Sequence, residues 1–234
     1  MHISFDEKNH VYTNVNTEDN YISVTTLLSR FKPKFDVDAQ AAIFAAKHNL
    51  LVEDVKQYWN DLNRISTTRG TAIHNILENY INTGSADTDE QKELIQYIKK
   101  QLQDHAGYKV TAEELMYNDL YQVAGTADIV LENNKFFKIW DLKTNKKFRF
   151  TNNFNKDTFL LSPVEHLPNC EYSNYSLQLS MYAFMKEQLT GKKCTELKII
   201  YLKTNPVTQE NTVEEYYLSY LKKDIQEILE QIKK

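Results

Sequence analysis

The sequence predicts an α/β fold, in which a central mixed β-sheet is flanked by helices. Apolar and polar residues alternate over three consecutive stretches between residues 108 and 144, which is the period-two pattern of β-strands. On both sides of this region, apolar residues recur every three or four positions, as on the buried face of a helix. Strands between helical segments predict helices packed on a sheet.

Length and composition limit the class of protein. The chain has 234 residues, enough for one large domain with its own core. It has no apolar run of 18 residues, so we expect no transmembrane helix, and its N-terminus is not that of a signal peptide. Cys170 and Cys194 are the only cysteines, which excludes a disulfide framework and a four-cysteine metal site. We therefore expect a cytoplasmic protein.

The charge and the aromatic content leave nucleic-acid binding open. The net charge of −4 argues mildly against a chain that coats duplex DNA, although an acidic metal site lowers the net charge and a local groove can still be basic. Fifteen tyrosines serve either core packing or stacking on unpaired bases. Composition does not decide between these two roles.

The N-terminal third predicts a hairpin followed by helices. Residues 3–13 and 19–25 alternate around a turn at 14–18, and a short helix begins with Ser23 or Thr25 as its N-cap. Residues 37–63 are expected to form two helices with a break near Asn49. A separate helix over 67–82 has Thr67 or Thr68 as its N-cap, and another helix covers 88–104.

The centre of the chain predicts an antiparallel meander. Its strands are expected at 108–117, 121–131 and 136–144, with turns at 118–119 and 133–134. Residues 145–174 have weak periodicity and predict either a functional flap or a segment whose regular structure the pattern does not reveal.

The C-terminal part predicts a helix over 175–189, strands at 195–203 and 212–218, and a final helix over 221–232. We predict a single domain, 1–234. It consists of an N-terminal part (1–66), a core with the flap (67–203) and a C-terminal strand and helix (204–234).

The chemistry centres on Asp141-Leu142-Lys143, at the end of the third strand of the meander. Asp141 and Lys143 share a face, while Leu142 points the other way. An acid that holds a cation and a lysine that orients water suit phosphodiester hydrolysis. Taken alone, the same tripeptide is more typical of a solvated strand end.

The register of the preceding hairpin strengthens the first interpretation. A two-residue turn at 133–134 would set Asp128 opposite Ile139, diagonal to Asp141 and about 7–8 Å from it. Two carboxylates and the carbonyl oxygen of Leu142 would suit Mg²⁺ or Mn²⁺. A register slip of one residue would instead turn Asp128 to the opposite face.

Four short motifs then occur in one order between residues 70 and 182. They are Gly70-Thr-Ala-Ile-His74, Gly125-Thr-Ala-Asp128, Asp141-Leu142-Lys143 and Gln178-Leu-Ser-Met-Tyr182. Together they resemble the PD-(D/E)XK nuclease superfamily in its RecB-like branch. Ser23-Val24-Thr25 resembles the beginning of phage members and of the mitochondrial genome-maintenance exonuclease. The chain departs from the superfamily pattern in having Trp140 before Asp141.

The resemblance implies a restriction-endonuclease-like core and a role for each motif residue. Asp128, Asp141 and His74 would bind Mg²⁺ or Mn²⁺, and Lys143 would be the catalytic lysine. Gln178 would position that lysine or a phosphate, and Tyr182 would lie close to the substrate backbone. An upstream acid is also expected, for which Glu113 and Glu114 compete; the spacing to Tyr117 favours Glu113.

The expected activity is that of a metal-dependent DNA exonuclease preferring single-stranded or frayed ends. Lys146, Lys147 and Arg149, just after the catalytic strand, would contact phosphates, or would form an ordinary solvated cluster. A structure-specific endonuclease and a non-catalytic DNA-binding subunit are the alternatives. We expect DNA and proteins of replication, recombination or repair as partners, in a bacterial or phage-infected cell. We expect neither a membrane nor an iron–sulfur cluster.

Overall fold

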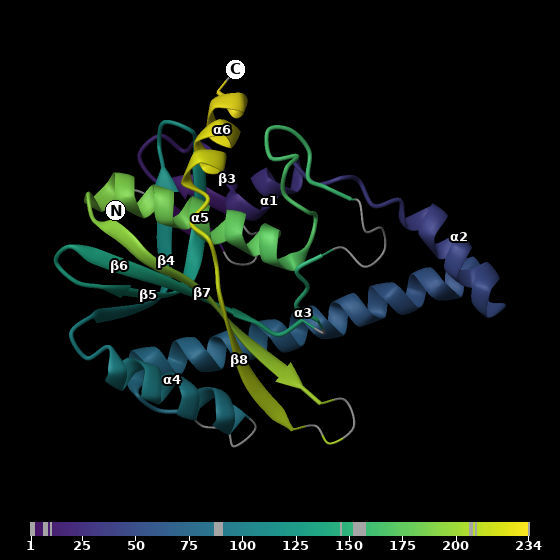
Figure 1. Ribbon diagram of the computed structural model, residues 1–234, viewed down its shortest axis with the longest axis horizontal. Helices are drawn as coiled ribbons and strands as arrows, with labels where there is room; N and C mark the ends of the chain where they lie inside the picture. Colours follow the sequence, from purple (N-terminus) through teal and green to yellow (C-terminus); the bar gives the residue numbers. More distant parts are fainter. Residues whose placement is uncertain are drawn as a thin grey trace.

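The computed structural model describes residues 3–6, 9, 11–86, 91–145, 147–151, 158–205, 208 and 210–233. Its centre is an eight-stranded mixed sheet with helices on both faces (Figure 1). The predicted α/β class is therefore confirmed. The strands are β1 (Ile3–Asp6), β2 (Val11–Asn14), β3 (Asn20–Ser23), β4 (Lys109–Asn118), β5 (Val123–Glu132), β6 (Phe136–Lys143), β7 (Lys193–Thr204) and β8 (Asn211–Tyr217). The helices are α1 (Val24–Ser29), α2 (Val37–His48), α3 (Val52–Thr83), α4 (Lys92–Asp104), α5 (Glu171–Thr190) and α6 (Lys222–Ile232).

Two apolar clusters hold the helices to the sheet. On one face, α1, α5 and α6 pack on side chains that include Phe137 and Ile139 of β6. On the other face, Ile73 of α3 and Ile98 of α4 pack on Trp140 and Leu142. None of the helices in the described part of the chain is both long and apolar enough to cross a membrane.

The sheet has a gap in its pairing at the middle of β5. β4 runs antiparallel along one edge of β5, as the meander predicts. On the other edge, β3 pairs in parallel with Val123 and Ala124, and β6 pairs antiparallel with 129–132. Residues 125–128 lie between these two partners. The sequence motif that ends in Asp128 therefore occupies the place where β3 and β6 separate.

The predicted register of the β5–β6 hairpin was wrong by two residues. Ile129 pairs with Trp140, and Val130 pairs with Ile139. The turn lies one residue later than predicted, because Asn133 donates its backbone N–H to Phe136 and its side chain accepts the N–H of Lys135 and of Phe136. The same register, continued by one pair, sets Asp128 directly opposite Asp141. A shift of two preserves the face, so the two carboxylates still lie side by side.

The predicted helix break at Asn49 is confirmed, but a second break near residue 66 does not exist. Asn49 adopts a left-handed conformation (φ 54°) that ends α2. α3 then runs without interruption for 32 residues, with Thr67 and Thr68 in its interior rather than at an N-cap. Residues 63–68 contain neither glycine nor proline, so nothing in them breaks a helix. Ser23 is the N-cap of α1, with its side chain accepting the N–H of Thr26.

The predicted hairpin and flap differ from the structure in extent. The N-terminal segment forms three strands rather than two, and β3 joins them to the main sheet. α5 begins at Glu171, four residues earlier than predicted. Leu160 and Val164 of the predicted flap are buried in the core below α5, while residues 152–157 lie outside the described part. Strands of the one sheet come from all three predicted parts, and the single-domain organisation stays a prediction.

Candidate metal centre and active site

Asp128 is fixed by a backbone hydrogen bond at the gap in the sheet. Its Oδ2 accepts the N–H of Leu142 at 2.7 Å. The side chain of Asp128 thus accepts a hydrogen bond from a backbone N–H of β6 that lies just beyond Ile129–Trp140, the last residue pair between the two strands. The residue is 9% exposed. A buried carboxylate held in this way has one defined position, as a metal ligand requires.

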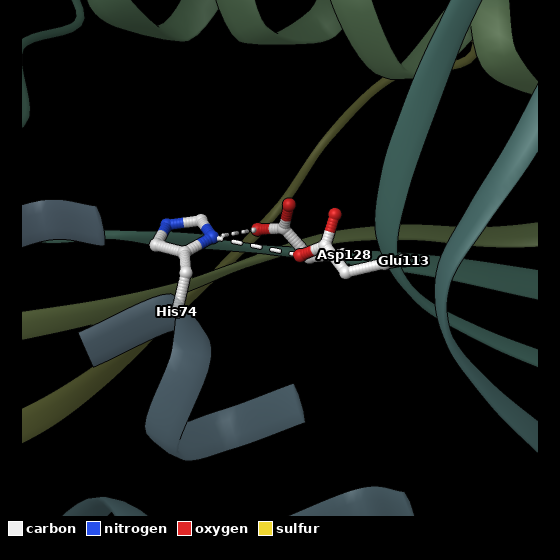
Figure 2. Close-up of side chains that lie close together, drawn as sticks. All are labelled: His74, Glu113 and Asp128. Atoms are coloured by element: carbon white, nitrogen blue, oxygen red, sulfur yellow. Dashed lines mark ion pairs between the residues drawn. The ribbon is translucent and has the colours of Figure 1, made fainter. Parts of the chain in front are cut away.

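His74 reaches Asp128 from α3. Ile73 and Leu77 anchor this part of the helix in the apolar core. The Nδ1 atom of His74 lies 3.4 Å from Oδ2 of Asp128 (Figure 2). Burial lowers the pKa of His74, but the carboxylate of Asp128 more than offsets this and raises it to about 9. Without a bound cation, the imidazole is therefore held as a positive partner of Asp128.

Glu113 is the upstream acid that faces this pair. It lies opposite Asp128, between the paired residues Ala112 and Glu114, and its Oε1 is 4.0 Å from Nδ1 of His74. Its φ of 47° is in the left-handed region, which costs about 1–2 kcal/mol for a residue with a Cβ. Glu114 instead forms an ion pair with the buried Lys186 at 2.5 Å. The strained backbone thus directs Glu113, and not Glu114, toward His74.

The three side chains form a group with the donors that a divalent cation needs. The ligand atoms of His74, Glu113 and Asp128 all lie within 4.8 Å of one another. Burial and the charge of Asp128 raise the pKa of Glu113 to about 7. Such crowding of carboxylates is unfavourable unless a cation or a proton neutralises it. Two carboxylates and an imidazole fit Mn²⁺ and Mg²⁺.

Asp141 and Lys143 lie beside this group and contact each other. Nζ of Lys143 is 2.5 Å from Oδ2 of Asp141, which is 1% exposed. Burial and the charge of Asp128 raise the pKa of Asp141 to about 6. Burial lowers the pKa of Lys143, but the carboxylates of Asp141 and Asp128 outweigh it and hold this pKa above its usual value. In the metal-free chain, Asp141 is therefore the ion-pair partner of Lys143.

A cleft of about 990 Å³ is lined by His74 and Glu113 of the metal-binding group and by Gln178 and Tyr182 of α5. Gln178 donates to the hydroxyl of Tyr182 at 3.1 Å. The ring of Tyr182 lies directly over Gly125, where a Cβ would come within 2.6 Å of the ring. Glycine in this motif is thus required by the close approach of α5 to β5.

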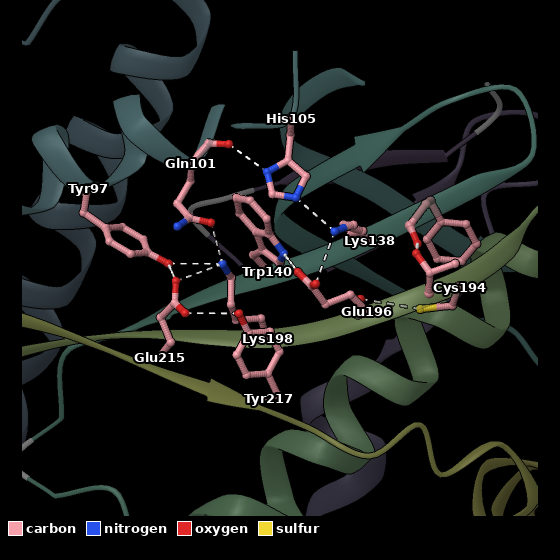
Figure 3. A network of polar contacts seen from close by, with 12 residues as sticks. Tyr97, Gln101, His105, Lys138, Trp140, Cys194, Glu196, Lys198, Glu215 and Tyr217 are labelled. Carbon is pink, nitrogen blue, oxygen red and sulfur yellow. Dashed lines mark hydrogen bonds and ion pairs between the residues drawn. The ribbon is translucent and has the colours of Figure 1, made fainter. Parts of the chain in front are cut away.

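The strand that carries Asp141 and Lys143 is anchored from its other face (Figure 3). The indole N–H of Trp140 donates to Glu196 at 2.6 Å, and Nζ of Lys198 lies 3.8 Å from the centre of the indole ring. Lys198 also donates to Tyr97, Gln101 and Glu215. Trp140 is therefore a buried anchor for β6.

The structure does not bring the side chains of the other predicted residues into the metal-binding group. The side chain of Leu142 is buried in the opposite core. Lys146 lies outside the described residues, and Lys147 is exposed. Arg149 is held by Glu171 in an ion pair and lines a different cavity from the cleft.

Tyr175 is a residue of the site that was not predicted from the sequence. The centre of its ring lies 5.1 Å from Nζ of Lys143. The signal that could have identified it is its spacing: Tyr175 is three residues before Gln178, on the same side of a helix.

Comparisons with known proteins add a likeness in shape. No protein-family model and no curated protein gives a significant match. The solved structures that are similar at low identity include a candidate exonuclease from Eubacterium rectale, with a TM-score of 0.41 and 13% identity over 91% of this chain and 77% of that chain. Another is SSO0001, with a TM-score of 0.40 and 13% identity over 92% of this chain and 76% of that chain. A phage-related exonuclease from Haemophilus somnus 129PT has a TM-score of 0.36 and 14% identity over 91% of this chain and 92% of that chain. At these identities and TM-scores, the likeness supports no argument about activity.

Proposed function

We propose that the chain is a divalent-metal-dependent nuclease that hydrolyses phosphodiester bonds in DNA. The observation that carries the proposal is the meeting of His74, Glu113 and Asp128 within 4.8 Å of one another, beside the Asp141–Lys143 pair and next to a cleft that His74 and Glu113 line. A group of acids with a buried, positively charged lysine suits a reaction in which negative charge develops on phosphate oxygens.

His74, Glu113 and Asp128 would hold Mg²⁺ or Mn²⁺, with Asp141 and the carbonyl oxygen of Leu142 as further ligands. The bound cation would supply Lewis-acid stabilisation of the scissile phosphate and of the leaving oxygen. The tight packing of Leu142 on the other face of β6 supports a fixed carbonyl position. Asp141 would thus both bind the cation and form the ion pair with Lys143.

Lys143 would act as a fixed positive charge and hydrogen-bond donor. Its raised pKa keeps the amine protonated at neutral pH, so it does not remove a proton from water in this state. Its ion pair with Asp141 and its contact with the ring of Tyr175 hold the amine in one position. From there it would orient the attacking water and offset charge on the phosphate.

Gln178 and Tyr182 would line the path of the substrate backbone. Both face the cleft and are hydrogen-bonded to each other. An exonuclease that prefers single-stranded or frayed ends is the specific activity we propose, with Lys146 and Lys147 as further phosphate contacts. It would serve replication, recombination or repair in the cytoplasm of a bacterial or phage-infected cell, as the resemblance to RecB-like nucleases implies.

The test is digestion of end-labelled linear and circular DNA, single- and double-stranded, with Mg²⁺, with Mn²⁺ or with EDTA. We expect metal-dependent release of nucleotides from linear DNA and none from circles, with Asp141→Ala inactive. Cutting of circles would replace the exonuclease proposal with an endonuclease of the same chemistry. Absence of cleavage under all conditions, or full activity of Asp141→Ala, would overturn the nuclease proposal.

A further inference from the structure

A second cavity, of about 380 Å³, lies at the N-terminal end of α5. We call it the Lys32 pocket. Its polar lining consists of Lys32, Arg149, Asn169, Glu171, Asn174 and Tyr175. Lys32 belongs to the segment between α1 and α2, which is tied to the core by the buried Phe31. The pocket thus brings together three separate parts of the chain.

The described lining of the pocket carries one more positive than negative charge, because Lys32 and Arg149 share the single carboxylate of Glu171. Arg149 is neutralised by Glu171, because its Nε lies 3.0 Å and 2.9 Å from the two carboxylate oxygens and its Nη2 lies 2.5 Å from one of them. Within the described residues, the amine of Lys32 has no ion pair and no hydrogen bond. Lys32 is partly buried, and this burial lowers its pKa more than the charge of Glu171 raises it. A partly buried cation whose nearest carboxylate is already bound to an arginine is unfavourable unless a ligand supplies further negative charge.

The pocket adjoins the proposed active site through Tyr175. One side of this residue lines the pocket, and its ring centre is 5.1 Å from Nζ of Lys143. Tyr175, Gln178 and Tyr182 are three and four residues apart, so they follow one another along one side of α5. The first lines the Lys32 pocket and the other two line the cleft. An extended strand lying along this side of α5 would therefore pass both openings.

We propose that the Lys32 pocket binds a phosphate group of the nucleic-acid strand, next to the phosphate at the metal centre. This inference rests on the proposed function. The phosphate would accept hydrogen bonds from the amine of Lys32, for which the described residues provide no acceptor. It is either an internal phosphodiester or the terminal phosphate monoester of the strand. Both present anionic phosphate oxygens to the pocket, so the proposal is for binding of a phosphate group in either form.

The test measures binding of a fluorescent oligothymidylate as a function of salt, in EDTA so that no cleavage occurs. Each phosphate contact to a single strand contributes about 0.7 to the slope of log K against log salt. We expect Lys32→Met to weaken binding about fivefold to twentyfold and to reduce the slope by about 0.7. Lys32→Arg should keep the slope, since the positive charge remains.

Lys34→Met is the matched control, because Lys34 is exposed and lies only two residues away, outside the lining. It should leave the slope unchanged. If Lys32→Met changes neither affinity nor slope, or changes them no more than Lys34→Met does, the pocket assignment is overturned. Thermal unfolding of each variant checks that the fold is intact.

Oligonucleotides with a 5′-phosphate, with a 3′-phosphate and with neither distinguish the two sources. An effect of Lys32→Met on all three means an internal phosphodiester, and an effect confined to one phosphorylated end means the terminal monoester. If the wild-type chain cleaves DNA but the slopes of Lys32→Met and Lys34→Met agree, only this inference fails. If the wild-type chain neither binds nor cleaves DNA, the proposed function fails with it.

Discussion

Nδ1 of His74 lies 3.4 Å from the same Asp128 oxygen that accepts the backbone N–H of Leu142. One carboxylate oxygen therefore joins helix α3 to the end of strand β6. The contact lies where β5 pairs with neither β3 nor β6. It brings together a histidine of the helical layer and an aspartate of the sheet, both of which are residue types that bind metal ions.

Replacing His74 with alanine should weaken Mn²⁺ binding at least about tenfold, since one of three clustered donors is removed. Isothermal titration calorimetry at pH 7.5 measures the change. His48→Ala is the control, because His48 is exposed on α2 and far from the cluster in sequence. Equal affinity of His74→Ala and the wild-type chain would remove His74 from the metal site.

Lys143→Met should lower kcat about 100- to 1000-fold while leaving Mn²⁺ affinity nearly unchanged. The substitution keeps the length of the side chain but removes the charge that faces the phosphate in the proposed mechanism. Lys223→Met, at an exposed position of α6, should leave both quantities unchanged. A parallel loss of metal binding in Lys143→Met would mean that Lys143 acts through the cluster instead.

Glu113→Gly should be more stable than Glu113→Ala by about 1 kcal/mol. Both lose the carboxylate, but only glycine adopts a φ of 47° without steric cost. Urea unfolding gives the difference in the free energy of unfolding. Both variants should bind Mn²⁺ more weakly than the wild-type chain. Equal stabilities would show that the backbone at residue 113 relaxes when the carboxylate is absent.

Gly125→Ala should lower the free energy of unfolding by about 1–3 kcal/mol, because its Cβ would lie 2.6 Å from the ring of Tyr182 and 3.2 Å from Val24. In the background of Tyr182→Leu, the same substitution should cost less, because the closest ring atom is gone. A double-mutant cycle in urea measures this coupling. Strict additivity of the two changes would contradict the close contact.

Lys192→Met should lower stability at pH 7, and the loss should become smaller as the pH falls below the unfolded-state pKa of Glu132. Burial raises the pKa of Glu132, but Lys186 and Lys192 outweigh it and lower that pKa. A carboxylate with a lowered pKa stabilises the fold above its unfolded-state pKa, and this contribution disappears as the pH falls through the folded-state value. The loss at pH 7 should be below about 1 kcal/mol, because Lys192 and Glu132 are both partly exposed.

Lys193→Met is the control for this pH dependence, since Lys193 is exposed and adjacent in sequence. Urea unfolding of the three chains at pH 7 and pH 3 provides the comparison. A destabilisation of Lys192→Met that persists unchanged at pH 3 would show that lost packing, and not the ion pair, is responsible.

The spacing of residues along the strands predicted more of the site than the turns did. The turn at the β5–β6 hairpin was placed one residue too early, because Asn133 and Asn134 are equally good turn formers and only the hydrogen bonds of Asn133 decide between them. The resulting error of two residues left Asp128 and Asp141 on the same face, since side chains alternate with a period of two.

The choice between Glu113 and Glu114 depended on a backbone conformation that the sequence does not encode locally. Glutamate has no preference for a φ of 47°, so neighbouring contacts must impose it. The partner of Glu114 is Lys186, 72 residues away. The continuous α3 is a similar case, since residues 65–68 are weak helix formers that packing at both ends keeps helical.

Hydrophobic period and chain order were enough to predict the α/β class, the meander and the shared face of Asp128 and Asp141. Three features became visible in the folded molecule alone: the acid that joins His74, the pairing of Asp141 with Lys143, and the place of Tyr175 in the Lys32 pocket with its ring near Lys143. Most of these contacts join strands and helices that are far apart in the chain. Their distances follow from how the two faces of the sheet are packed, which no local pattern specifies.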